Sequence, residues 1–203
     1  PFLPGTPQRP LNLIRVMPAE GEMQTLPRDL PAVAADVIER IRARAPRVHC
    51  ITNTVAQAFT ANMLLAAGAV PSMTLAREEI GAFVAGADAL LVNLGTFDAE
   101  RRAAVETALA AVGQRPWVLD PVFVDRSPAR LAFAQTLLAL RPTALRLNRA
   151  ELAALTATPQ ETAQHVAARI GAAVAVSGAT DIVTDGAAEL AIANGHRLMA
   201  SVT

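Results

Sequence analysis

The sequence predicts an α/β fold in which a mostly parallel β-sheet lies between helices on both faces. From residue 29 onward, short apolar runs alternate with stretches that have the periodicity of helices. The runs are apolar at nearly every position, which is typical of strands in parallel sheets. Most runs end in polar or charged residues, and open α/β sheets bind ligands at the carboxyl ends of their strands. These features together favour a three-layer α/β/α architecture.

The expected elements follow one another without an internal repeat. Strands are expected at residues 48–51, 69–74, 89–93, 116–120, 143–147 and 172–176. Helices are expected at residues 54–67, 77–85, 100–112, 129–140 and 149–170, the last with a break at Pro159. An amphipathic helix before the first strand carries an apolar face of Val33, Val37, Ile38 and Ile41. Residues 182–186 and 189–194 are expected to form antiparallel strands or hairpins.

The chain of 203 residues is long enough for one substantial core, so a single folded domain is expected over residues 29–203. Residues 1–28 differ from the rest, because seven of the fourteen prolines lie between Pro1 and Pro31. Such a segment fits poorly into a helix or a sheet. It is predicted to be an extended or poorly ordered arm, and no function is assigned to it.

The composition excludes several classes of function. The formal net charge is zero, which provides no basic surface for nucleic acid or for an anionic membrane. All 18 basic residues are Arg, so a P-loop and Schiff-base chemistry on Lys are excluded, and a cationic phosphate contact must come from Arg. The single Cys50 permits no internal disulfide, as is usual in a reducing compartment. No apolar run reaches membrane-spanning length, so a cytoplasmic protein is expected.

Polar side chains follow the expected strands at the points where the strands end. Asn53, Gly95, Asp120, Arg146 and Ser177 should therefore converge on one edge of a parallel sheet. A carboxylate beside a guanidinium is suited to phosphoryl transfer with magnesium, with Glu151 as a second carboxylate. No Ser-His-Asp pattern and no zinc-type Cys/His spacing is present.

Each candidate also has an ordinary structural alternative. Asn53 and Asn148 can cap the helices that follow them, and Met73 can be core filler. Asp120 can be a turn residue before Pro121, and Arg146 can form a surface ion pair with Glu151. The remaining alternative concerns His49, which is expected to be a hydrogen-bonded structural histidine rather than a catalyst.

Several ordered segments of the chain resemble the motifs of the hydroxyethylthiazole kinase family, thiamine-salvage enzymes of the ribokinase-like superfamily. The matching segments are residues 48–53 (V-H-C-I-T-N), 60–62 (T-A-N), 69–73 (A-V-P-S-M), 93–96 (N-L-G-T), 119–122 (L-D-P-V), 146–151 (R-L-N-R-A-E), 177–186 and 195–199. The resemblance covers essentially the whole expected domain, and several separated matches are far more specific than one glycine motif.

The resemblance implies ATP- and Mg²⁺-dependent phosphorylation of the hydroxyl group of 4-methyl-5-(2-hydroxyethyl)thiazole, in thiamine biosynthesis or salvage. The implied thiazole-binding residues are Asn53, Met73 and Gly95. The implied ATP-binding residues are Arg146, Asn148 and Ser177, and the implied magnesium residues are Asp120 and Glu151. A homotrimer with sites between subunits is also implied by the family and not by the residue pattern. A small-molecule alcohol and ATP are thus the expected partners.

The chain departs from the family pattern at several positions that affect nucleotide geometry and metal handling. Leu147 and Ala179 stand where many members have Gly and Glu, and residues 123–126, including Asp125, replace a Gly-rich turn. The chain ends at Thr203, before the family's anion-hole loop, its Gly-Cys turn and the C-terminal helices. The catalytic Cys is therefore expected beyond Thr203, with no catalytic residue and little or no kinase activity in these 203 residues.

Two alternatives remain open from the sequence. One is a related ribokinase-fold enzyme, such as a hydroxymethylpyrimidine kinase or a hydrate dehydratase, although the motif at residues 48–53 and Met73 speak against it. The other is a non-catalytic ligand-binding oligomer that lacks the anion-hole loop.

Overall fold

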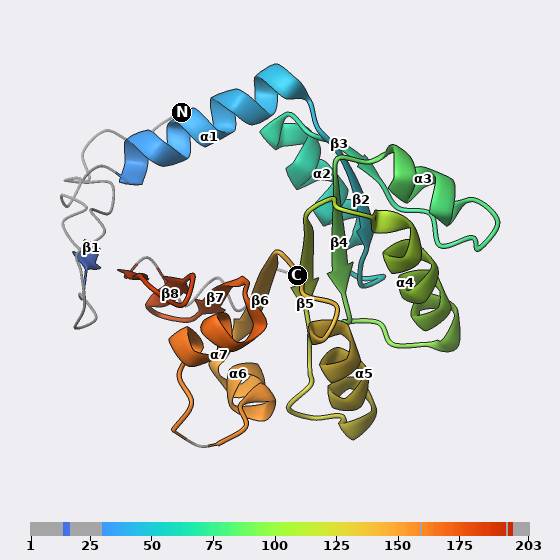
Figure 1. Cartoon of the computed structure of the whole chain (residues 1–203). Coiled ribbons are helices and arrows are strands. Elements are labelled where there is room, and N and C mark those ends of the chain that lie inside the picture. The colour runs from blue at the N-terminus through green and yellow to red at the C-terminus, as the bar shows by residue number, and fades with distance from the viewer. Residues whose placement is uncertain (1–13, 17–29, 159, 194, 197–203) are drawn as a thin grey trace.

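The computed structural model describes residues 14–16, 30–158, 160–193 and 195–196, which form one nine-stranded sheet with helices packed against it (Figure 1). The helices are α1 (Leu30–Arg44), α2 (Gln57–Ala67), α3 (Ile80–Gly86), α4 (Ala99–Val112), α5 (Pro128–Leu138), α6 (Arg149–Leu155) and α7 (Ala163–Ile170). The strands are β1 (Ile14–Val16), β2 (Arg47–Ile51), β3 (Val70–Ser72), β4 (Ala89–Asn93), β5 (Trp117–Asp120), β6 (Ala144–Asn148), β7 (Ala173–Ser177), β8 (Asp181–Thr184) and β9 (Glu189–Ile192).

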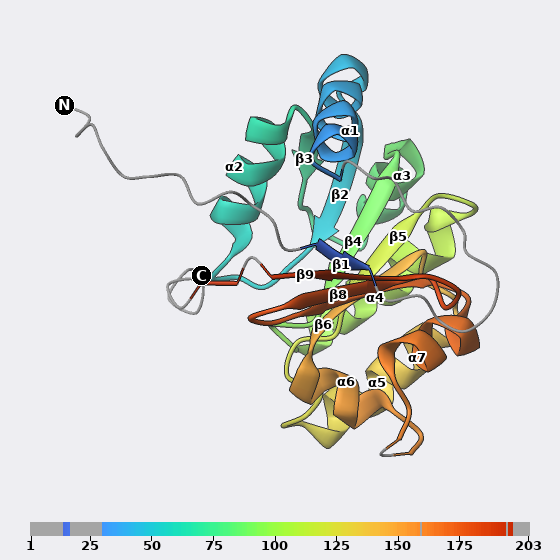
Figure 2. The ribbon, with the colours of Figure 1, turned by 90° about the vertical axis from the view of Figure 1, so that its left-hand side faces the viewer.

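The sheet is parallel over six strands and antiparallel at one side. Its strand order is β1-β9-β8-β7-β6-β5-β4-β2-β3. Strands β3, β2, β4, β5, β6 and β7 pair in parallel, whereas β8, β9 and β1 are added in antiparallel fashion. In Figure 2, these last three strands run below α1 and α2. The prediction of a mostly parallel sheet with an antiparallel tail is confirmed.

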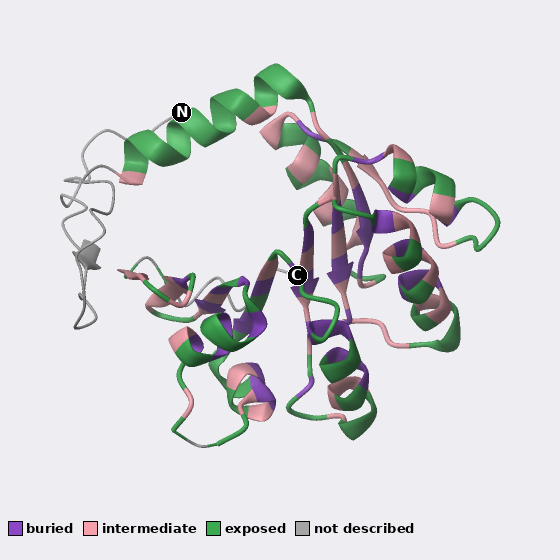
Figure 3. Ribbon diagram, in the orientation of Figure 1, coloured by how far each residue is buried: buried purple, intermediate pink, exposed green. Residues whose placement is uncertain are grey.

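The core lies on one face of the sheet. Alternate residues of the central strands are buried there, such as Leu90 and Val92 on β4 and Leu145 and Leu147 on β6, and they pack against the helices. Figure 1 shows α3, α4 and α5 on this side, and α1 and α2 on the other. The other face is less covered: its residues on β4 to β7 are half-buried or exposed (Figure 3). The predicted three-layer arrangement with helices on both faces is confirmed, although the strands are buried more deeply on one face than on the other.

Most element boundaries differ from the prediction by one to three residues, and two of these differences lie near the expected site. Helix α2 begins at Gln57 rather than at residue 54. Residues 54–56 form a turn instead, in which the N–H group of Thr54 bonds to the hydroxyl of Thr96 and those of Val55 and Ala56 bond to Oδ1 of Asn53. Strand β3 ends at Ser72, its last residue in register with β2, so Met73 and residue 74 follow the strand rather than extend it. Gly68 ends α2 in a left-handed conformation with φ of 96°, which glycine adopts more easily than residues with a Cβ.

Part of the proline-rich arm differs from the prediction as well. Residues 14–16 form β1, which pairs antiparallel with the edge strand β9. An edge strand presents unpaired N–H and C=O groups, so a short segment can add to it even where prolines surround that segment. Residues 1–13 and 17–28, like the end of the motif at residues 195–199, lie outside the described part of the chain.

The apolar face predicted for α1 points away from the core, and large apolar side chains of α2 are exposed as well. On α1, Val33 and Val37 are exposed, and on α2 the side chains of Phe59 and Met63 are exposed by 47% and 55%. Neither helix contains a buried residue. These helices therefore present apolar surface that the described residues leave uncovered. No helix within the described ranges has both the length and the apolar character needed to cross a bilayer.

Candidate functional site

The order of the strands makes the chain connections diverge between β2 and β4. The chain leaves β2 through α2 toward the outer strand β3, and it leaves β4 through α4 toward β5 on the other side. These two connections lie on opposite faces of the sheet (Figure 1). In open α/β sheets, ligands bind at the carboxyl ends of strands where the connections diverge in this way. Asn53 and Gly95 follow the two strands at this point.

Asn53 and Gly95 lie in close contact. A methyl group added at Gly95 would lie 2.6 Å from Cβ of Asn53 and 2.8 Å from Oδ1 of Asn93, so only glycine fits there. Oδ1 of Asn53 accepts the N–H groups of Val55 at 2.7 Å and Ala56 at 3.2 Å. Asn53 was considered as a helix cap. Its side chain instead stabilises the turn at residues 54–56, just before α2 begins.

Asp120 at the end of β5 is a buried carboxylate that lacks one partner. Its Oδ2 accepts a hydrogen bond of 2.7 Å from Nδ2 of Asn93, while its Oδ1 is buried and has no hydrogen-bond partner among the described residues. Nη1 of Arg146 lies 3.6 Å from Oδ1, which is an ion pair too long for a hydrogen bond. Burial raises the pKa of Asp120, opposed by the charge of Arg146 and the bond from Asn93. Asp120 is therefore more than a turn residue before Pro121.

Glu151 is almost fully buried and its two oxygens are used by the backbone. Oε1 accepts the N–H group of Phe123 at 3.0 Å, and Oε2 accepts the N–H group of Asn148 at 2.8 Å. In return, Oδ1 of Asn148 accepts the N–H groups of Ala150 and Glu151, which completes a capping box at the start of α6. The cap predicted as an alternative for Asn148 is confirmed. The alternative of a surface ion pair between Arg146 and Glu151 is wrong, because Arg146 pairs with Asp120, as the main expectation had it.

Arg146, Asn148 and Ser177 lie on neighbouring strands, on the face away from the core. Ser177 is in register with Asn148, and its hydroxyl donates to the carbonyl oxygen of Leu147 at 3.3 Å. The side chain of Arg146 is 53% exposed. Beside Ser177, Gly195 packs closely against the backbone, since a Cβ at Gly195 would lie 2.5 Å from the carbonyl oxygen of Gly178. This end of the sheet therefore has the accessible guanidinium of Arg146 beside the closely packed backbone of Gly178 and Gly195.

The structure brings the predicted residues to one edge of the sheet. They follow or end consecutive strands and comprise Met73 after β3, Asn53 after β2, Gly95 after β4, Asp120 on β5, Arg146 and Asn148 on β6, and Ser177 on β7. Continuous contacts run from Asn53 through Gly95 and Asn93 to Asp120, and from there to Arg146.

Two residues of this network were not among the predicted site residues. Asn93 donates to Asp120 and accepts the N–H group of Gly95 at 2.8 Å. Arg130 on α5 donates through Nη1 to the carbonyl oxygens of Leu94 and Val122, so it links the loops that follow β4 and β5. The sequence signal for Asn93 was its place at a strand end, but Arg130 lies on a helix and carried no such signal.

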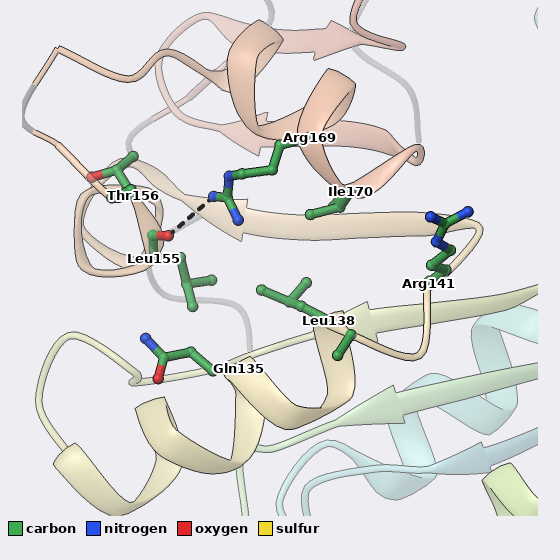
Figure 4. A pocket seen from close by; sticks show the side chains of 9 residues that line it. Gln135, Leu138, Arg141, Leu155, Thr156, Arg169 and Ile170 are labelled. Carbon is green, nitrogen blue, oxygen red and sulfur yellow. Dashed lines mark hydrogen bonds between the residues drawn. The ribbon is translucent and has the colours of Figure 1, made fainter.

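A cavity of about 390 Å³ lies elsewhere in the molecule, between α5 and the ends of α6 and α7 (Figure 4). Leu138 and Gln135 contribute from α5, and Arg169 donates to the carbonyl oxygen of Leu155 at 3.4 Å. Its lining residues Arg141 and Ile170 precede β6 and β7, so the cavity is at the amino ends of the strands. It is separate from the candidate site.

The donor set suits a magnesium ion that is bound mainly by substrate. In the part of the chain that the structure describes, no three Asp, Glu, His or Cys side chains gather to enclose a metal. Mg²⁺ is commonly bound by one or two carboxylates together with phosphate oxygens and water, rather than by a protein cage. The free Oδ1 of Asp120, with the carboxylate of Glu151 close enough to raise the pKa of Asp120, fits that mode.

Comparison with known proteins agrees with this arrangement. The profile of the hydroxyethylthiazole kinase family matches residues 38–203. A probable hydroxyethylthiazole kinase of Agrobacterium fabrum (strain C58) is 46% identical over 174 residues, which cover 85% of this chain and 66% of that protein. The chain thus spans about two thirds of the length of this relative.

Solved structures show the same relationship. The hydroxyethylthiazole kinase protein from Pyrococcus horikoshii OT3 superposes with a TM-score of 0.79 at 34% identity, over 85% of this chain and 71% of the other. A putative ribokinase II from E. coli superposes with a TM-score of 0.54 at 14% identity, over 91% and 76% of the two chains, which shows the ribokinase-like fold alone. On the sequence profile, the close relative and the fold, this chain belongs to the hydroxyethylthiazole kinase family.

Proposed function

We propose that this protein transfers the γ-phosphoryl group of ATP to the hydroxyl group of 4-methyl-5-(2-hydroxyethyl)thiazole, as part of thiamine biosynthesis or salvage. The observation that carries the proposal is the buried Asp120 carboxylate, with its free Oδ1 beside the Arg146 guanidinium, at the carboxyl edge of the sheet. Phosphoryl transfer depends on charge neutralisation and positioning at such a point. Family membership favours this substrate over those of the pyrimidine kinases and over a purely binding role.

The thiazole alcohol is proposed to bind at the carboxyl ends of β2 and β4. Gly95 lets the side chain of Asn53 lie directly against the backbone there, because a Cβ at that position would come within 2.6 Å of Cβ of Asn53. Asn53 contributes its amide group, whose nitrogen donates no hydrogen bond among the described residues. Met73, half-buried after β3, supplies a flexible apolar surface for an aromatic heterocycle.

ATP is proposed to bind beside β6 and β7. Arg146 is accessible and carries the guanidinium that would contact a phosphate. Asn148 and Ser177 are in register on adjacent strands, so the Asn148 amide nitrogen and the Ser177 hydroxyl can both reach one nucleotide. Arg149, next in the chain at the start of α6, adds a second cation near Gly178.

Magnesium is proposed to bind at Asp120, with Glu151 as the second carboxylate. When bound with ATP, the ion would neutralise charge on the phosphates. The protein's own residues supply the rest: Asp120 presents a free oxygen, Arg146 balances its charge, and Glu151 holds the loop that begins at Pro121. The thiazole hydroxyl would be oriented between Gly95 and Asp120, in line with the transferred group.

The protein is also proposed to form a homotrimer through its first two helices. The exposed apolar side chains Val33 and Val37 on α1, with Phe59 and Met63 on α2, form a surface that one chain leaves open to water. Sedimentation velocity should give three times the monomer mass, and Phe59→Asp should shift the distribution toward monomer. A wild-type monomer at tens of micromolar protein would refute the trimer.

The function is tested by binding and by turnover. Isothermal titration should show binding of hydroxyethylthiazole. With ATP and Mg²⁺, ³¹P NMR should show at most slow formation of its phosphate ester, in line with the little or no kinase activity expected of these 203 residues. Asp120→Asn should abolish the magnesium dependence of nucleotide binding, whereas Asp36→Asn, in an exposed ion pair on α1, should leave it unchanged. Binding of hydroxymethylpyrimidine in place of the thiazole would favour the related kinase instead.

A further inference from the structure

The side chain of His49 is fully buried, and it is not among the residues proposed above to contact the thiazole or the nucleotide. It lies on β2, and its Nδ1 is 2.8 Å from Oγ of Ser72, while its Nε2 is 3.1 Å from the carbonyl oxygen of Thr74. The ring of Phe83 on α3 packs against it, with 6.0 Å between the ring centroids. One imidazole ring thus bonds to both chain neighbours of Met73.

The partners determine which nitrogen carries the proton. The carbonyl oxygen of Thr74 can only accept, so Nε2 must be the donor, and Nδ1 then accepts from the hydroxyl of Ser72. Burial lowers the pKa of His49, opposed by its bond to Thr74. The ring is therefore neutral near pH 7 and occupies a single tautomer, which is the form that makes both bonds.

The segment around Met73 depends on such side-chain bonds because it lies beyond the sheet. The last pair in register between β2 and β3 is His49 with Ser72, so Met73 follows without a ladder partner. The hydroxyl of Thr74 donates to Glu79 and accepts the N–H group of Ala76 at 3.3 Å. His49 is thus the element that connects this segment to the buried centre of the sheet.

We propose that His49 is a positioning residue for the thiazole site: it holds residues 72 and 74 so that Met73 presents its side chain to the thiazole ring. The proposal rests on the proposed function, since the contact of Met73 with the thiazole belongs to it. His49 and Ser72 are the last pair in register between β2 and β3, so the two bonds of His49 hold the backbone on both sides of Met73, which lies just beyond the strand. His49 acts through Met73 and stays out of contact with the substrate.

Four variants separate the two bonds. His49→Leu removes both and leaves the buried carbonyl oxygen of Thr74 without a donor. His49→Gln keeps a donor for Thr74 and loses the acceptor for Ser72, while Ser72→Ala removes only the Ser72 bond. The double variant His49→Gln/Ser72→Ala tests coupling, because Ser72→Ala should weaken binding in the wild type but not in His49→Gln. His165→Gln, at the exposed start of α7, is the matched control.

The expected results are specific to one substrate. His49→Leu should weaken hydroxyethylthiazole binding about tenfold, and His49→Gln and Ser72→Ala about threefold. Binding of a non-hydrolysable ATP analogue should change less than twofold in all variants. Equal weakening of both ligands, or unchanged thiazole binding in His49→Gln and Ser72→Ala, would overturn the proposal. If His49→Leu fails to fold, the other two variants and their double combination decide.

A second readout does not depend on thiazole binding. With ¹³C-methyl methionine, the Met73 signal, assigned by Met73→Leu, should move in His49→Gln more than the other four methionine signals. In the wild type, ¹⁵N spectra should show protonated Nε2 and unprotonated Nδ1 for His49. If the wild type binds no hydroxyethylthiazole, the proposed function is wrong. The spectra still test whether His49 positions Met73. An unmoved Met73 signal or the opposite tautomer would refute its positioning role.

Discussion

Glu151 accepts the backbone N–H group of Phe123 at 3.0 Å, although 28 residues separate them in the chain. The same carboxylate accepts the N–H group of Asn148, so it ties the loop after Asp120 to the start of α6. Both donors lie beside the site proposed for magnesium. The geometry of that site therefore depends on Glu151 even before any ligand binds.

Replacing Glu151 by Gln should destabilise the fold. Gln offers one acceptor oxygen for two buried N–H donors, and an unsatisfied buried group costs about 1–3 kcal/mol. Urea denaturation should therefore show a loss of that order in the free energy of unfolding. Glu106→Gln, on the exposed surface of α4, should change it by less than about 0.5 kcal/mol. Equal effects of the two substitutions would show that the buried hydrogen bonds of Glu151 contribute nothing.

Phe123 adopts φ of 62°, a left-handed conformation that residues with a Cβ enter only at a cost. Phe123→Gly and Phe123→Ala lose the same contacts with Arg126 and Arg130, and they differ in backbone freedom. The Gly variant should be more stable than the Ala variant by about 1 kcal/mol, because only Gly relieves the strain. Thermal unfolding of both proteins measures the difference, and an Ala variant at least as stable as the Gly variant would contradict it.

Asp120 should oppose folding at neutral pH in the absence of ligands. Its pKa is raised in the folded protein, so its favourable contribution is complete at pH values below its unfolded pKa and is lost as pH rises through the folded value. Asp120→Asn should therefore stabilise the ligand-free protein by about 1 kcal/mol at pH 7. The gain should shrink as the pH falls toward the ordinary carboxyl range.

The measurement for Asp120 is chemical denaturation of wild type and Asp120→Asn at several pH values, without magnesium. Asp36→Asn, in an exposed ion pair with Arg40, provides the control for simple loss of charge. A variant less stable than wild type at pH 7, or a gain that grows on acidification, would show that the sign is wrong.

Cys50 should be inert to thiol reagents in the native protein. Its side chain is fully buried on β2, and burial raises its pKa to about 12, so almost no thiolate exists at pH 8. A disulfide reagent should label it only after unfolding in urea, with a native rate at least about a hundredfold lower. Rapid labelling of the native protein would mean that β2 opens frequently.

The strands could be predicted well because continuous apolar runs reflect burial directly. The expected strand 89–93 has the bounds of β4, and the expected strand 48–51 differs from β2 by one residue. Helix ends were less predictable where a side chain competes for the backbone. The N–H group of Thr54 bonds to the hydroxyl of Thr96, 42 residues away, and no local pattern shows this contact at the start of α2.

The site was predictable in its location and not in its pairing. Polar residues at strand ends meet because parallel strands end at one edge, and this placed Asp120 and Arg146 together. Their ion pair depends on the register between β5 and β6, and no local pattern encodes that register. For the same reason the sequence left Glu151 open as an alternative partner of Arg146. The link from Arg130 to two loops was likewise invisible, because it spans 36 residues to Leu94.

Along the strands β4 to β7, alternate side chains serve different purposes. Residues such as Val92, Leu119, Leu145 and Val176 face the helices and hold the fold together, while their neighbours carry the polar chemistry. Selection can therefore change what Arg146 or Ser177 recognises without removing a single methyl group from the interior. Substitutions that change the ligand preference should therefore have little effect on the free energy of unfolding.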